Sequence, residues 1–211
     1  MTQGASQGTS KDVGPPSGPQ PPAPQILVVC TGNVCRSPLV ERLLQPVLDR
    51  VFGIGGVGVR SAGTGALTGE PMDRRAAGVL LGLGGDSAGF VSRQLEPTMV
   101  ANASLVLTAT REHRATAVRM HPRALHRAFT VREFAALLRG ASIERVPTDP
   151  VACLAALAEV AMSRKVHLAG QNPNNLDIVD PYRRPDDAYA LMRAQIAPAI
   201  EIIGAALTPA R

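Results

Sequence analysis

The segment from Ile26 to Pro38 constrains the fold of this chain more than any other. Four apolar residues, Ile26–Val29, lead into a cysteine loop that contains a glycine, and an amphipathic run begins at Leu39. A short apolar run bounded by a turn predicts a buried strand, and the periodicity after it predicts a helix. A helix N-terminus presents unpaired N–H groups and a partial positive charge, so the loop is predicted to bind an anion such as phosphate.

Two side chains in this loop predict chemistry as well as binding. Cys30 ends the predicted strand and Arg36 lies at the predicted helix start. Helix-start amides and a guanidinium favour the thiolate, which is the reactive form of cysteine. The planar fork of Arg36 can hold two phosphate oxygens. We therefore expect Cys30 to be a nucleophile. The alternative, a buried packing cysteine, would leave Arg36 without a partner.

The remaining loop residues are predicted to shape the site. Gly32 lets the backbone turn its amides inward, and Asn33 can adopt a left-handed turn. Ser37 can donate to the Cys30 sulfur, and Pro38 stands early in the helix, where its missing N–H costs nothing. The substrate-binding residues expected in this loop are Thr31, Gly32, Asn33, Val34, Cys35 and Ser37.

Strand and helix signals alternate along the chain. Strands are predicted at 26–30, 57–61, 104–109 and 126–130, and helices from the loop to 51 and at 72–83, 111–120, 131–139, 149–165 and 186–207. This alternation predicts an α/β fold, a three-layer sandwich with a four-stranded parallel sheet and helices on both faces. In such folds ligands bind at the carboxyl ends of the strands, where Cys30 lies.

Residues 1–25 differ in composition from the rest of the chain. They are mostly Gly, Ser, Gln and Pro, and they contain too few apolar side chains to bury. We expect a disordered tail there and one domain over 26–211. The proline clusters could also dock to a proline-binding module, which nothing else in the segment supports. No signal peptide or run as long as a membrane span is evident, so we expect a cytoplasmic protein with no membrane partner.

The net charge of +5 suits an anionic substrate. No basic stripe with interleaved aromatic residues indicates nucleic-acid binding. Three cysteines make no disulfide framework, and the scattered histidines make no metal site with them. We expect a monomer without cofactor or metal. The four histidines are His113, His121, His126 and His167.

Two Asp-Pro pairs compete for the role of general acid. A carboxylic acid is needed to protonate a poor leaving group, but Asp-Pro is also a common turn or helix start. Asp149 opens a helix with an apolar face, so we expect it to be a cap. Asp180 stands in a loop before the last helix and is the predicted acid. Tyr182 could form an aromatic wall for a substrate ring or be a half-buried loop tyrosine.

The sequence V-C-T-G-N-V-C-R-S-P-L-V-E closely resembles the active-site loop of the low-molecular-weight protein tyrosine phosphatases. Ser61–Thr64 is similar to the family's S-A-G-T, residues 92–95 and 104–108 to the segment entering its third strand, and Asp180-Pro181-Tyr182 to its D-P-Y loop. The resemblance covers about residues 26–207. It implies a phosphatase for phosphotyrosine on proteins, with a phosphocysteine intermediate, and a bacterial tyrosine kinase as a possible substrate.

Some positions depart from the family pattern. Phe90 stands where the family often has a histidine that braces the loop. Arg183 and Arg184 replace a second aromatic residue, which could favour acidic flanking sequence or leave two solvated side chains. The resemblance also implies a reversible disulfide between Cys30 and Cys35, and the alternative for Cys35 is a buried packing role.

Four other functions remain open from the sequence. An arsenate reductase-like enzyme needs a further cysteine pair, but only Cys153 follows Thr108. An arginine phosphatase of this family tends to carry a small polar residue in place of Val34. A phosphocarrier domain needs neither Arg36 nor Asp180, and a non-catalytic phosphopeptide-binding module would be expected to lose the nucleophile or the acid.

Overall fold

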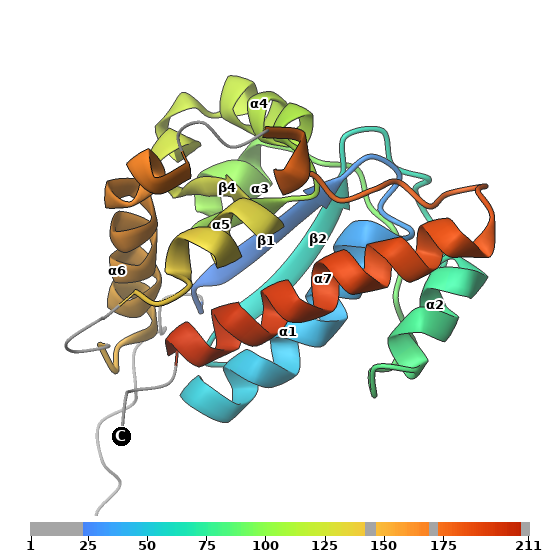
Figure 1. Ribbon diagram of the computed structural model, residues 1–211, viewed down its shortest axis with the longest axis horizontal. Helices are drawn as coiled ribbons and strands as arrows, with labels where there is room; N and C mark the ends of the chain where they lie inside the picture. Colours follow the sequence, from blue (N-terminus) through green and yellow to red (C-terminus); the bar gives the residue numbers. More distant parts are fainter. Residues whose placement is uncertain (1–22, 142–146, 169–172, 208–211) are drawn as a thin grey trace, which may run out of the picture.

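A four-stranded parallel sheet forms the centre of the computed structural model, which describes residues 23–141, 147–168 and 173–207. The strand order is β2-β1-β3-β4, so the chain turns from one side of β1 to the other after β2 (Figure 1). Ligands bind at such a switch point in open α/β sheets. The strands are β1 Gln25–Cys30, β2 Gly58–Gly63, β3 Leu105–Thr108 and β4 Ala128–Thr130.

Helices cover both faces of the sheet, which confirms the predicted three-layer α/β fold (Figure 1). Along β1, Val28 points into a core shared with α1, α2, α5, α6 and α7, whereas Leu27 and Val29 point into a smaller core with α3 and α4. Both faces are buried, which is why β1 reads as an uninterrupted apolar run. The helices are α1 Arg36–Phe52, α2 Arg74–Leu81, α3 Pro97–Asn102, α4 Arg111–Met120, α5 Val131–Leu138, α6 Pro150–Ser163 and α7 Asp186–Leu207, with 3-10 turns at Pro122–Arg127, Lys165–Leu168 and Pro173–Leu176.

Several predicted boundaries need correction. His126 was predicted in the fourth strand, but it lies in the 3-10 turn that precedes β4. The helix α3 was not predicted, because six residues starting at Pro97 are too few to show helical periodicity. The helix α2 is capped by Asp73, whose carboxylate accepts from the N–H groups of Arg75 and Ala76. Most of the predicted tail, residues 1–22, lies outside the described residues, but its last residue, Gln25, is the first residue of β1 and pairs with Gly58, so the domain begins earlier than predicted.

The expectation that no run is as long as a membrane span is wrong for the last helix. Within the described residues, α7 is long and apolar enough to cross a membrane, judged by its length and composition only. Its most apolar stretch has a mean hydropathy of 1.4. Its apolar residues include Met192, Ile196 and Ile203, which are buried in the core beneath the sheet. The helix therefore serves as the central packing element of its layer, beside α1 and α5 (Figure 1).

Candidate active site

The predicted loop surrounds a cavity of about 150 Å³ at the carboxyl end of β1. Cys30 lies at its floor and is 1% exposed, whereas Thr31 is exposed at its mouth. The cavity therefore joins three separate parts of the chain: the loop, the segment after β2 and the segment before α7. Its lining residues are Cys30, Thr31, Gly32, Val34, Cys35, Arg36, Gly65, Leu67, Asp180 and Tyr182.

The carbonyl groups of the loop point away from the cavity. Those of Thr31, Gly32 and Val34 accept hydrogen bonds at 3.1, 3.0 and 2.8 Å from N–H groups of the segment after β2. In a trans peptide the N–H lies opposite the C=O, so the next amides along the loop point inward, where an anion would sit. The close approach requires Gly63, because a Cβ there would lie 2.2 Å from the Thr31 oxygen.

Asn33 holds the loop in this shape. Its backbone is left-handed, with φ of 53°, as the sequence predicted. Its Oδ1 accepts from the N–H of Arg93 at 2.8 Å, which leaves both Nδ2 protons for the hydroxyls of Ser37 at 2.9 Å and Ser61 at 2.8 Å. Asn33 is fully buried, so these three bonds satisfy the side chain completely.

Sequence reasoning missed part of this brace. Ser61 donates to the buried carboxylate of Glu41 at 2.5 Å, so a polar chain runs from α1 through β2 to the loop. The S-A-G-T resemblance included Ser61 and the loop resemblance ended at Glu41, but neither residue was given a role. Phe90, at the position where the family often has a histidine, is buried in the core beside the loop, with the Arg42 guanidinium 5.9 Å from its ring centre.

Ser37 is placed to serve the Cys30 sulfur. The two side-chain atoms, Oγ and Sγ, are 2.9 Å apart. The serine oxygen already accepts a hydrogen bond from Asn33, so the serine O–H is free to donate a hydrogen bond to the sulfur. This donor would stabilise a thiolate on Cys30, as the sequence analysis anticipated.

Arg36 is a buried cation with unused hydrogen-bonding capacity. Its side chain is 5% exposed, and its Nη2 lies 2.8 Å from a carboxylate oxygen of Asp180. The same guanidinium donates to the Thr31 hydroxyl at 3.3 Å and to the Ile178 carbonyl at 3.5 Å. Its Nε is buried and has no partner among the described residues. A buried N–H without an acceptor is costly, so this donor indicates an anion that binds in the cavity.

The acid loop, defined here as residues 177–184, brings Asp180 over the cavity. Its backbone is tied down before the acid, where Ile178 donates to the Ala109 carbonyl and Val179 to the Gln195 side chain, both at 2.8 Å. The Asp180 side chain itself remains 43% exposed. The loop thus holds the carboxylate at Arg36 while leaving it open to solvent.

Tyr182 is half-buried, as one of its two predicted descriptions has it, and it lines the cavity; its role as an aromatic wall for a substrate ring stays a prediction. The guanidinium of Arg183 stacks over its ring at 5.1 Å, with the Arg183 backbone in a left-handed conformation, φ of 59°. Leu67 lines the cavity too. Arg184 is exposed. The cavity therefore combines a cationic floor with apolar wall residues.

Cys35 contrasts with Cys30 inside the same loop. Burial raises the pKa of its thiol, and the nearby carboxylate of Asp73 raises it further. All three cysteines are buried and free. A neutral, buried thiol suits the packing role for Cys35, and its disulfide with Cys30 stays a prediction from the resemblance. The third cysteine, Cys153, is fully buried in α6.

Comparisons with known proteins agree with this geometry. A model described as low molecular weight phosphotyrosine protein phosphatase matches residues 25–151. The low molecular weight protein-tyrosine-phosphatase Etp of Escherichia coli (strain K12) is 33% identical over 164 residues, which cover 78% of this chain and 81% of Etp.

Two solved structures are similar in fold. The YwlE arginine phosphatase from Geobacillus stearothermophilus is 27% identical, with a TM-score of 0.60 over 86% of this chain and 90% of that one. The tyrosine phosphatase AmsI of Erwinia amylovora is 24% identical, with a TM-score of 0.63 over 89% and 95%, and shows the fold alone. The resemblance read from the sequence is confirmed: the chain belongs to the low molecular weight phosphotyrosine protein phosphatase family.

Proposed function

We propose that this protein is a cysteine-dependent protein-tyrosine phosphatase. The observation that carries the proposal is the unpartnered Nε of Arg36, buried in a cavity that Cys30 and Asp180 also line. A fixed cation with a free donor, a nucleophile and a carboxyl group around one anion site are the parts that phosphoryl transfer requires. No single one of these groups would indicate the reaction.

In the first step the Cys30 thiolate attacks phosphorus, and the bond from phosphorus to the leaving oxygen breaks. Arg36 and the inward amides hold the equatorial phosphate oxygens, so the site is preorganised for the charge of the transition state. A phosphate that takes the Nε and Nη2 donors of Arg36 displaces Asp180 from its ion pair. A protonated Asp180 then gives its proton to the leaving phenolate.

In the second step Asp180, now ionised, removes a proton from water. The water oxygen attacks phosphorus, the phosphorus–sulfur bond breaks, and inorganic phosphate leaves. The sulfur departs as a thiolate, which Ser37 stabilises through its hydroxyl at 2.9 Å. Arg36 and the amides supply the positive charge in both steps, so we expect no metal requirement.

Phosphotyrosine is the substrate that we propose. Leu67 and Tyr182 offer apolar surface to an aromatic ring above the phosphate. Val34 is buried in the loop, where an arginine phosphatase of this family tends to carry a small polar residue. Relatives such as Etp are named protein-tyrosine phosphatases. A bacterial tyrosine kinase in the cytoplasm is the proposed phosphoprotein partner, with the phosphatase acting as a monomer.

The test is hydrolysis of p-nitrophenyl phosphate with chelator, by the reduced wild type and three variants. We expect Cys30→Ser to be inactive, Asp180→Ala to be slowed, and Asp149→Ala, which changes the other Asp-Pro pair, to match the wild type. Parallel assays with phosphotyrosine and phosphoarginine should favour phosphotyrosine. Activity in Cys30→Ser would contradict the mechanism, and a preference for phosphoarginine would contradict the substrate.

A further inference from the structure

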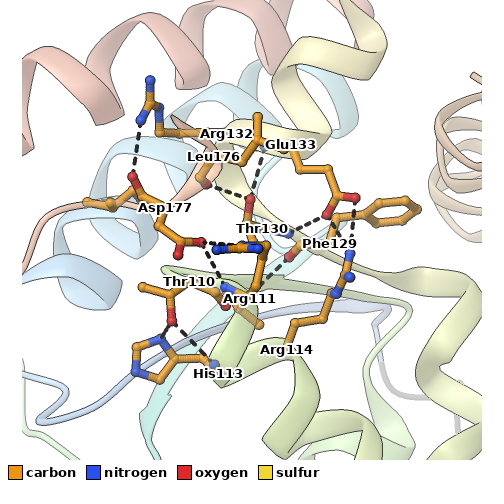
Figure 2. Close-up of polar contacts among 12 residues, drawn as sticks. Thr110, Arg111, His113, Arg114, Phe129, Thr130, Arg132, Glu133, Leu176 and Asp177 are labelled. Carbon is orange, nitrogen blue, oxygen red and sulfur yellow. Dashed lines mark hydrogen bonds and ion pairs between the residues drawn. The ribbon is translucent and has the colours of Figure 1, made fainter. Parts of the chain in front are cut away.

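The first turn of α4 places an otherwise unused histidine against the phosphate-binding loop. His113 is 7% exposed, and the two-step reaction described above gives it no part. Its imidazole Nδ1 lies 2.7 Å from the Thr110 hydroxyl, and its Nε2 lies 2.9 Å from the Thr31 hydroxyl (Figure 2 shows the bond to Thr110). Both ring nitrogens therefore have a partner, and one partner is a residue of the cavity.

The hydrogen bond to Thr31 leads directly to the cation of the site. The Thr31 oxygen accepts from Nη2 of Arg36 at 3.3 Å, and the same nitrogen reaches Asp180 at 2.8 Å. An arginine can only donate, so the direction of this bond is certain. His113 is thus one hydroxyl group away from the guanidinium that holds the phosphate.

The donors and acceptors can be satisfied by one proton arrangement. The Thr110 oxygen accepts from the backbone N–H of His113 at 3.4 Å, so its own proton is available for Nδ1. A neutral imidazole then carries its proton on Nε2 and donates to Thr31. Burial, with the charge of Arg36, lowers the pKa of His113 to about 4 and keeps it neutral. The Thr31 hydroxyl, which already accepts twice, can turn its own proton into the cavity.

We propose that His113 is a positioning residue, which holds the Thr31 oxygen against Arg36 and directs the Thr31 hydroxyl proton toward a bound phosphate. The proposal rests on the phosphatase function proposed above. It gives the loop a second brace, which shares no hydrogen-bond partner with Asn33. It also gives Thr31 a specific task in holding the phosphate, where the sequence predicted substrate binding without saying which of its groups takes part.

Other contacts fix the first turn of α4 in place. The Asp177 carboxylate accepts from the N–H of Arg111 at 2.9 Å, at the start of the helix. The Thr130 hydroxyl donates to the Leu176 carbonyl at 2.8 Å (Figure 2). This bond ties Leu176, which directly precedes Asp177, to the end of β4. The turn that carries His113 is therefore attached directly to the acid loop at Asp177 and, through the neighbouring Leu176, to the sheet, as a positioning role requires.

Two substitutions of His113 separate its two hydrogen bonds. An asparagine amide reaches the position of Nδ1, so His113→Asn can keep the contact with Thr110 but loses the one with Thr31. A glutamine amide reaches the position of Nε2, so His113→Gln can keep the contact with Thr31. We expect kcat/KM to fall roughly tenfold in His113→Asn and to be largely retained in His113→Gln, because a hydrogen bond to an ionic network is lost only in the first. The exposed His126→Asn is the matched control.

Inorganic phosphate, a competitive inhibitor, provides a readout of the anion site itself. Its inhibition constant should rise in His113→Asn by a factor similar to the fall in kcat/KM. A purely structural histidine would lower the melting temperature in both variants and leave this constant unchanged. Equal kinetics in wild type and His113→Asn would overturn the proposal, as would equal losses in the two variants.

A double-mutant cycle with Thr31 makes the test specific. Thr31→Val removes the hydroxyl, so adding His113→Asn to it should produce no further loss, whereas His113→Asn should still act in Thr31→Ser. Additive losses in the valine background would also overturn the proposal. An inactive wild type would instead contradict the phosphatase function, so the two failures are distinguishable.

Discussion

The phosphate-binding loop and the acid loop meet at one ion pair, but they are built differently. In the first, Cys30, Asn33 and Ser37 are at most 1% exposed, and their polar atoms are hydrogen-bonded to one another. In the second, the Asp180 side chain is 43% exposed; it pairs with Arg36 at 2.8 Å and accepts from the N–H of Tyr182 at 3.3 Å. The phosphate-binding loop is packed like a protein core. The acid loop has a hydrogen-bonded backbone and a single carboxylate that remains open to solvent.

The difference between the loops fits the roles proposed for them. Groups that stabilise charge in the transition state work best when they do not have to reorganise, so the loop amides and Arg36 are held by neighbours. A proton donor must face the substrate in one step and water in the next, so Asp180 needs access to solvent. Substitutions in the two loops should therefore fail in different ways.

Among the residues around the Cys30 nucleophile, the largest effect is expected for the cation. Arg36→Lys keeps the charge but removes the planar fork and the unpartnered Nε. We expect kcat/KM for p-nitrophenyl phosphate to fall by roughly 10³-fold, because removing one preorganised donor already costs 10²–10³. Phosphate inhibition should weaken in parallel. A lysine variant within tenfold of wild type would show that charge alone suffices and would remove the distinction between the loops.

Asp180→Asn should have a smaller effect, and one that depends on the leaving group. We expect about a 10²-fold loss of kcat with phosphotyrosine, whose leaving group needs a proton. With p-nitrophenyl phosphate, which releases a less basic phenolate, the loss should be smaller. Phosphate inhibition should remain or strengthen, because the carboxylate no longer competes for Arg36 at 2.8 Å. Equal losses with both substrates would argue against proton transfer by Asp180.

Asn33→Ala should damage stability and activity together, as expected for a packed loop. It would leave the N–H of Arg93 and the hydroxyls of Ser37 and Ser61 without their bonds in a buried region. We expect about 3 kcal/mol less free energy of unfolding in urea and a loss of activity in the folded fraction. Full stability with low activity would mean that the brace is less important to the fold than its burial suggests.

The contrast between the loops also explains how far the sequence could predict the site. Cys30, Arg36 and Ser37 are contiguous, so their chemistry could be read from spacing and from one strand and one helix. Ser61 enters the site through the pairing of β1 with β2, in which it stands beside Val28, and His113 enters through the first turn of α4. The spacing of residues along the chain does not predict such contacts, because they depend on the sheet register and on helix packing.

The same reasoning applies to the fold. The order of strands and helices was predictable because each long element has its own periodicity, as in α4 at Arg111–Met120. Short elements carry too few residues for a period, so α3 was missed and the start of β4 was predicted too early. Asp180 was preferred over Asp149 from its place before the last helix and from the resemblance, and its partner Arg36 became visible only in three dimensions.

The burial of His113 against the phosphate-binding loop predicts that the free energy of unfolding depends on pH, separately from any pH dependence of the catalytic steps. Its pKa is lowered from 6.5 to about 4 by burial and by Arg36, against the opposing charges of Asp180 and Asp177. As the pH falls from 6.5 to about 4, the imidazole becomes protonated in the unfolded chain but stays neutral in the folded chain, so the free energy of unfolding falls. The loss should reach at most about 3 kcal/mol by pH 4. Urea unfolding should show a flatter profile for His113→Asn and the wild-type slope for His126→Asn.

The smallest effect is expected for the second Asp-Pro pair, and it completes the comparison. The Asp149 carboxylate accepts from the N–H of Ala152 at 2.7 Å and caps α6, as predicted. Asp149→Ala should therefore lower the free energy of unfolding by about 1 kcal/mol in urea and leave kcat unchanged. Asp180→Ala should do the reverse, because its half-exposed carboxylate contributes little packing. If instead Asp149→Ala slowed hydrolysis of phosphotyrosine while Asp180→Ala did not, the assignment of the acid would be wrong. The same dipeptide thus acts as a cap where its carboxylate meets unpaired helix amides, and is proposed to act as an acid where it meets a buried arginine.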